Sequence, residues 1–126
     1  MTRTEKVIAF SAGAEAVTGL ALIAAPALVG RALLGDELPV LGRVVARCFG
    51  IALIALALAV WPDRDRVTGA PALRAMLLYN ASLAGYLGWL GLRWHLGGIL
   101  LWPAALLHAA VAVLLALPLL GVRDEA

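Results

Sequence analysis

The chain has few charged residues, a single cysteine and only two histidines. Asp, Glu, Lys and Arg make up 14% of its 126 residues, and apolar residues make up 63%, whereas a soluble domain has about 25% charged residues. A chain this short and this apolar could not cover its own core with polar surface, so a lipid bilayer is the expected solvent. Its net charge of +2 comes from scattered residues and not from a basic run, so the sequence predicts no nucleic-acid partner.

The scarcity of cysteine and histidine also limits the chemistry. Cys48 is alone, so it makes no disulfide within the chain and belongs to no Cys-x-x-Cys motif. Glu15 and His108 supply two metal ligands at most, and His95 falls in a connection between apolar segments. No paired carboxylates, nucleophile–base pair or phosphate-binding loop is readable. The sequence therefore predicts no catalytic residues, no metal and no cofactor.

Four long apolar segments fill most of the chain, at residues 7–29, 40–61, 72–92 and 98–120. Each is long enough to cross a bilayer as a helix. The connection between the last two is so short that those helices should form an antiparallel hairpin. We therefore expect an all-α integral membrane protein, an antiparallel four-helix bundle that forms one domain over residues 1–126. Pro26 and Pro103 are expected to bend the first and fourth helices.

Arginine and lysine are unequally divided between the two ends of the expected bundle. The richer side should be cytoplasmic, which places both termini there, and Glu15 inside the first apolar run argues against a cleaved signal peptide. The richer side carries Arg3, Lys6, Arg64, Arg66, Arg74 and Arg123, and the other side carries Arg31, Arg43 and Arg93.

Glu15 is the most informative residue, because a carboxylate within a membrane helix costs roughly 2.5–3.5 kcal/mol on insertion scales. With a helical rise of about 1.5 Å per residue, Glu15, Asn80 and His108 come out within roughly 5 Å of one another in depth, and Arg47 lies farther towards the outer face. Small residues accompany each of them, which indicates close helix packing and an interior position.

The direction in which helical side chains lean predicts the partners of these residues. Side chains lean towards the N-terminus of their helix, so we expect an inner contact between Glu15 and Asn80 and an outer one between His108 and Arg47. His108 should bridge the two levels. Tyr79 either packs between helices or lines a cavity. For each residue a purely structural role stays open: Asn80 as interhelical glue, and Glu15 as a partner of Arg47 or His108.

Several residues give the chain a resemblance to the DoxX-like superfamily of small four-helix bacterial membrane proteins. They are Gly19, Pro26, Leu34-Gly35, Leu41-Gly42-Arg43, Arg47, Gly50, Leu101-Trp102-Pro103 and His108. The resemblance covers most of the chain and implies a multi-pass protein of the bacterial inner membrane. Some members of the superfamily are accessory subunits of redox complexes, so it also implies a class of roles but no particular reaction.

A shorter resemblance concerns Ala14-Glu15-Ala16-Val17, which is similar to the membrane-embedded glutamate segment of small multidrug resistance transporters. Glu15 alone would carry over, as the carboxylate that couples protons to substrate. Two arginines at the start of the second segment and His108 in the fourth depart from that pattern.

We therefore expect a membrane protein in which Glu15, Arg47, Tyr79, Asn80 and His108 form a buried polar cluster. The cluster would bind a small lipophilic molecule, or the chain would serve as an accessory subunit of a membrane complex, with another membrane protein or a second copy as partner. One alternative is a proton-coupled transporter that uses Glu15. Another is a membrane enzyme in which Glu15 and His108 act as acid and base.

Overall fold

The computed structural model describes residues 1–62 and 70–122, and within these residues helices are the only regular secondary structure. The all-α prediction is therefore confirmed for the described chain. The predicted orientation depends in part on Arg64, Arg66 and Arg123, which lie outside the described residues. The elements are α1 (Arg3–Ala24), α2 (Pro26–Leu34), α3 (Val40–Val60), α4 (Ala70–Arg93), α5 (Leu101–Ala116) and the short 3-10 helix η1 (Leu117–Leu120).

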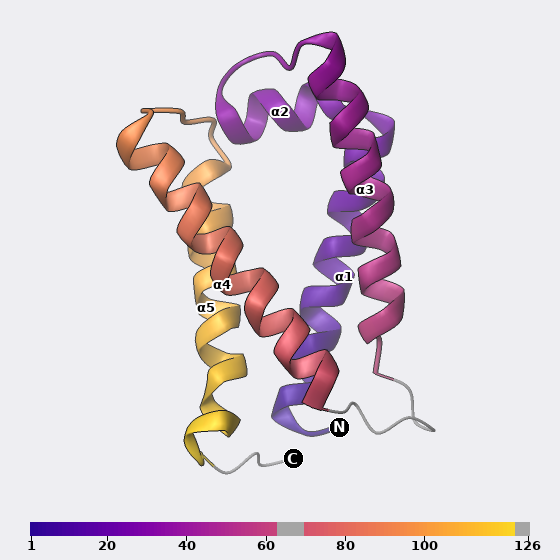
Figure 1. Cartoon of the computed structure of the whole chain (residues 1–126), viewed down its shortest axis with the longest axis vertical. Coiled ribbons are helices and arrows are strands. Elements are labelled where there is room, and N and C mark those ends of the chain that lie inside the picture. The colour runs from indigo at the N-terminus through magenta and orange to yellow at the C-terminus, as the bar shows by residue number, and fades with distance from the viewer. Residues whose placement is uncertain (63–69, 123–126) are drawn as a thin grey trace.

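The first apolar segment forms two helices, not one bent helix over residues 7–29. A capping box between Thr2 and Glu5 starts α1, which ends at Ala24. Pro26 has no N–H with which to continue the α1 ladder, and it sits at the first position of α2, where no N–H is needed. As a result α2 turns away and lies across one end of the molecule (Figure 1).

Pro103 was predicted to bend the helix of the fourth apolar segment, but it does not. The expected helix over residues 98–120 is α5, which begins later at Leu101, followed by η1. Pro103 is therefore the third residue of α5, within the first turn, whose N–H groups have no partner inside the helix. The second and third segments, predicted at 40–61 and 72–92, agree closely with α3 and α4.

The long helices pack as two pairs. α1 packs chiefly against α3, and α4 packs chiefly against α5. In Figure 1 the pairs lie side by side, with α2 across the upper end and the start of α1 near η1 at the lower end. The connection between α4 and α5 also holds α2, because the amides of Gly98 and Leu100 donate to the carbonyls of Leu33 and Ala32.

Gly19 of α1 and Gly50 of α3 make the closest contact within the first pair. A Cβ built on either glycine would lie 2.6 Å from the carbonyl oxygen of the other. No side chain fits in that space, so the two glycines allow the backbones to touch, as small residues do between membrane helices. The contact fixes the register of the pair. Ile23, four residues after Gly19 on α1, lies beside Arg47, three residues before Gly50 on α3.

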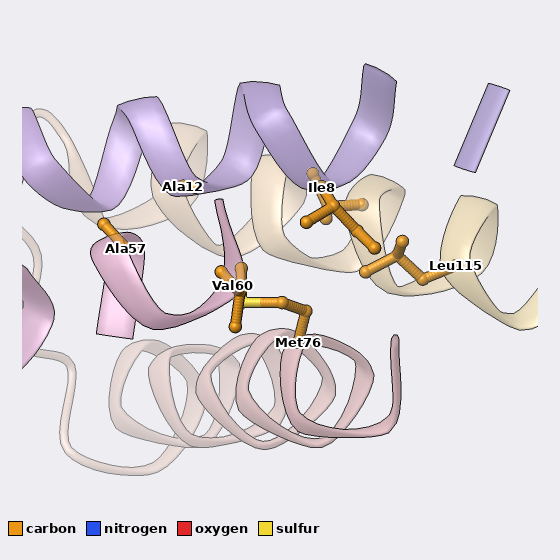
Figure 2. Packing of buried hydrophobic residues seen from close by; sticks show 7 residues of the cluster. Ile8, Ala12, Ala57, Val60, Met76 and Leu115 are labelled. Atoms are coloured by element: carbon orange, nitrogen blue, oxygen red, sulfur yellow. The ribbon is translucent and has the colours of Figure 1, made fainter. Parts of the chain in front are cut away.

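Two apolar clusters lie at different levels, and the first of them joins the two pairs. At the lower end, all four long helices contribute side chains (Figure 2): Ile8, Ala12, Ala57, Val60, Met76, Val111 and Leu115. Nearer α2, the second cluster joins α4 and α5 through Leu87, Leu101 and Ala105, with Leu33 and Leu34 of α2 packed against it. Along both α4 and α5, a layer of polar residues lies between these clusters.

Three helical segments in the described chain are long and apolar enough to cross a membrane: Arg3–Ala24, Val40–Val60 and Leu101–Leu120. Their outward faces carry many exposed Leu, Val and Ile side chains, which is the surface that lipid tails would cover. α4 is 24 residues long but is not among the three. It carries Tyr79, Asn80 and Ser82, which reduce its apolar character.

The Gly19–Gly50 contact predicts a strong asymmetry between two glycines of α1. Gly19→Ala should lower the free energy of unfolding by roughly 1–3 kcal/mol, because its methyl group meets a backbone carbonyl that cannot move aside easily. Gly13→Ala is the matched control, since nothing lies within 4 Å of its Cβ position. It should leave stability unchanged or raise it by up to about 1 kcal/mol. Denaturation in mixed micelles measures both, and equal losses would contradict the packing described.

Candidate functional site

Five residues from three helices form the polar layer, which we name the polar cluster: Ser11 and Glu15 of α1, Tyr79 and Asn80 of α4, and His108 of α5. Asn80 is completely buried, and Glu15 is only 3% exposed. The cluster lies between the two apolar clusters, one turn beyond Met76 on α4 and one turn before Val111 on α5. A polar layer in this position links the α1/α3 pair to the α4/α5 pair.

Asn80 is the centre of the cluster because its side chain bonds to two other helices. Its Nδ2 donates to the carbonyl oxygen of Met76 at 2.8 Å and to Oγ of Ser11 at 3.2 Å, and its Oδ1 lies 2.7 Å from Nδ1 of His108. The Met76 carbonyl can only accept, which fixes the orientation of the amide and turns Oδ1 towards His108. Nδ1 of His108 must therefore carry the hydrogen, so in the neutral ring Nε2 holds the lone pair.

Glu15 and Tyr79 form the second bonded pair. The Tyr79 hydroxyl donates to Oε2 of Glu15 at 2.7 Å. The other carboxylate oxygen, Oε1, is 3.9 Å from Nδ1 of His108, which is beyond hydrogen-bond length. The rings of Tyr79 and His108 meet edge to face, with centroids 5.8 Å apart. Oε1 thus keeps capacity to accept a hydrogen bond from a further donor.

Helical spacing explains how the sequence builds this layer. Ser11 and Glu15 are four residues apart on α1, so they lie on one face of that helix, as do Met76 and Asn80 on α4. Tyr79 and Asn80 are adjacent in sequence and so point in directions about 100° apart. Asn80 thereby faces the interior, while Tyr79 lies at the edge of the helix contact and is only partly buried.

The structure brings together four of the five residues predicted for the cluster, but with different partners. The predicted contact between Glu15 and Asn80 is replaced by Glu15 with Tyr79 and by Asn80 with His108. His108 does lie between Asn80 and Glu15. Ser11 was not among the residues predicted for the cluster, although its position four residues before Glu15 was a usable signal.

Arg47 lies away from the cluster, so the predicted approach to His108 was wrong. It is exposed on α3, and its Nε donates to the carbonyl oxygen of Ile23 at 3.1 Å. That carbonyl lies in the last turn of α1, where the break at Pro26 ends the helical ladder. Arginine is a favourable partner there, because the C-terminal end of a helix carries partial negative charge.

An open apolar groove of about 400 Å³ runs along the outer face of α4. Tyr79 is the one residue that both lines this groove and belongs to the polar cluster. Any molecule in the groove would therefore touch a side chain bonded directly to Glu15. The other lining residues are Ala75, Leu78, Ser82 and Leu83.

The cluster offers a carboxylate, a phenol, an amide and an imidazole, which are groups suited to hydrogen bonding. Glu15 and His108 are its only candidate metal ligands, and no group of three or more His, Cys, Asp or Glu side chains gathers in the part of the chain that the structure describes. A protein zinc site uses at least three such ligands. The arrangement therefore fits hydrogen-bonded recognition better than metal chemistry.

Comparison with protein-family models, curated proteins and solved structures found no match for this chain. What the protein does must therefore be inferred from the polar cluster and the groove.

The pairing within the cluster can be tested by double-mutant cycles. The pair Glu15→Met with Tyr79→Phe, and the pair Asn80→Leu with His108→Leu, should each show a coupling of roughly 0.6–1.7 kcal/mol, between the mean and the maximum found for hydrogen bonds between membrane helices. The crossed pair, Glu15→Met with Asn80→Leu, should couple much more weakly, because no bond joins those residues directly. Strong coupling in the crossed pair and none between Glu15 and Tyr79 would refute this geometry.

Proposed function

We propose that the protein binds a small lipophilic molecule from the bilayer in the groove of α4, with the head group of that molecule at Glu15 and Tyr79. The observation that carries the proposal is that Tyr79 belongs both to the groove and to the polar cluster. Its ring lines an apolar groove, and its hydroxyl is 2.7 Å from a carboxylate that is 3% exposed. A molecule with an apolar body and a polar end matches such a site.

The chemistry of the head group follows from the one carboxylate oxygen of Glu15 that accepts no hydrogen bond within the cluster. Oε1 of Glu15 lies beyond hydrogen-bond length from His108, so it favours a head group that donates a hydrogen bond, such as a hydroxyl or an amine. A carboxylate accepts more strongly than a neutral oxygen. An apolar environment increases the difference, because an unpaired polar group in hydrocarbon is costly.

The membrane topology belongs to the same proposal. We infer that α4 is a fourth crossing, because it packs along α5 over its length, and that the crossings form an antiparallel bundle in a bacterial inner membrane with both ends in the cytoplasm. The resemblance to the DoxX-like superfamily supports this topology. It also supports the accessory-subunit role, in which a helix of a partner protein would cover the groove.

The transporter and enzyme alternatives receive less support from the contacts. The groove is lined by residues of α4 alone and opens at the outer side of that helix, whereas a transporter needs a site open to each face of the membrane in turn. Nδ1 of His108 is bonded to Asn80 and not to Glu15, so the two residues are not arranged as a bonded acid–base pair.

The proposal predicts selective labelling of α4 by a photoreactive lipophilic alcohol. We expect a diazirine-bearing long-chain alcohol to label the Tyr79–Ser82 region saturably in nanodiscs, and its methyl ether, which has no donor, to label it about tenfold less tightly. Glu15→Gln should remove most of this difference, because a neutral amide oxygen accepts more weakly than a carboxylate. Mass spectrometry of labelled peptides gives the site and the affinity.

Two further variants serve as controls for that experiment. Tyr86→Phe removes the other tyrosine hydroxyl of α4, outside the polar cluster and the groove, and should change nothing. Ser82→Trp should fill the groove and reduce labelling by both probes. Labelling that is unsaturable, or that ignores both Glu15→Gln and Ser82→Trp, would show that the cluster only stabilises the fold.

A further inference from the structure

Arg43 and Arg47 lie on one face of α3, one turn apart. α3 is among the helices long and apolar enough to cross a membrane, and both arginines belong to it. Residues i and i+4 of a helix are neighbours on its surface. Val40, Val44 and Val45 beside them are exposed, so this part of α3 faces lipid wherever the helix crosses the bilayer. Arg47 is also exposed, beside its contact with α1, and Arg43 is half-buried, so both reach the part of α3 that is open to lipid.

The hydrogen bonds of these arginines leave most of their donors available. Arg47 uses Nε for the Ile23 carbonyl, and its side chain is exposed. Within residues 1–62 and 70–122, neither Arg43 nor Arg47 makes an ion pair, whereas the exposed Arg31 is paired with Glu37. A guanidinium carries five N–H donors. The two terminal amino groups of Arg47 and the whole guanidinium of Arg43 are therefore free to meet an acceptor.

The position of Arg47 along α3 makes an acceptor necessary. It is seven residues after Val40, the first residue of the helix, which is roughly 10 Å along the axis. The side chain leans back towards the helix start, yet it remains at the edge of the hydrocarbon. There, polar groups without partners are costly. The Ile23 contact also fixes the guanidinium in place, so the side chain has less freedom to reach water.

We propose that Arg43 and Arg47 together bind the phosphate group of an anionic phospholipid. Phosphate oxygens match the planar donors of guanidinium, and two arginines one turn apart can hold one phosphate from two sides. A lipid phosphate lies at the depth that these residues reach, and its acyl chains can lie against the exposed valines of α3. This site is on α3 and the groove is lined by α4, so the site does not depend on the ligand proposed there.

Native mass spectrometry of the purified protein with phosphatidylglycerol, phosphatidylcholine or inorganic phosphate tests the proposal. We expect the protein to retain phosphatidylglycerol in preference to phosphatidylcholine, whose choline offsets the phosphate charge. Arg43→Gln should weaken phosphatidylglycerol binding about tenfold, the typical effect of losing a charge-assisted hydrogen bond. Arg43 makes no hydrogen bond within the described chain that its replacement would break, so this variant should fold normally.

Arg93→Gln is the matched control, because it removes the same charge at the end of α4, away from this face. It should retain lipid like the unmodified protein. Equal losses in Arg93→Gln and Arg43→Gln would reduce the effect to net charge and overturn the site. Displacement of phosphatidylglycerol by millimolar inorganic phosphate would show that free phosphate, not lipid, is the ligand. Lipid retention that is unchanged in Arg43→Gln and in Arg43→Gln/Arg47→Lys would also overturn it.

Discussion

The side chain of Asn80 is the constraint on which the arrangement of the two helix pairs depends. Each pair has its own extensive contact, but the pairs meet over a smaller area. Asn80 spans that junction by bonding Ser11 of α1 and His108 of α5 from its place on α4. Its amide is oriented by the Met76 carbonyl. Because donor and acceptor are both used, a rotation or a shift of α4 by one residue would break both bonds to the other helices at once.

Apolar packing alone would not select this arrangement. The lower cluster is made of Ile, Ala, Val, Met and Leu side chains, which pack well in more than one register. In a membrane the lipid tails are as apolar as those side chains, so burial of apolar surface gives little preference for one helix partner over another. The Gly19–Gly50 contact and the hydrogen bonds of Asn80 have strict geometry, so they supply the specificity that apolar packing lacks.

The depth of the polar residues was easier to predict from the sequence than their hydrogen-bond partners. Depth follows from the helical rise, so Glu15, Asn80 and His108 could be placed at one level without knowing how the helices are arranged. Partners depend on the rotation of each helix about its own axis, and the apolar residues surround these helices too evenly to reveal it. Tyr79 and Ser11 were therefore not recognised as bonding partners. The same evenness concealed that Arg47 faces α1 and not the interior between the pairs.

For a related reason, the sequence predicted only a bend at Pro26 and not the end of one helix and the start of another. A proline within an apolar run can either bend a helix or end it. The outcome depends on which donors bond to the carbonyl groups that the proline leaves without a partner. Here the Arg47 side chain donates to the Ile23 carbonyl. Backbone amides of the connection before α5 donate to carbonyls at the other end of α2. Both partners are far away in sequence, so local reading could not include them. Arg47, which was expected in the polar cluster, instead bonds to the last turn of α1.

The hydrogen bonds of the polar cluster differ in what their loss would cost. A hydrogen bond between membrane helices averages only about 0.6 kcal/mol, so a movement of Tyr79 that lets a head group reach Oε1 of Glu15 would change the folding free energy little. The bonds of Asn80 are fully buried and join three helices, so no ligand can substitute for them without separating the pairs. Tyr79 is partly buried and lines the groove. The cluster thus has a fixed part at Asn80 and an exchangeable part at Tyr79 and Glu15, and only the exchangeable part is placed to meet a molecule from the membrane.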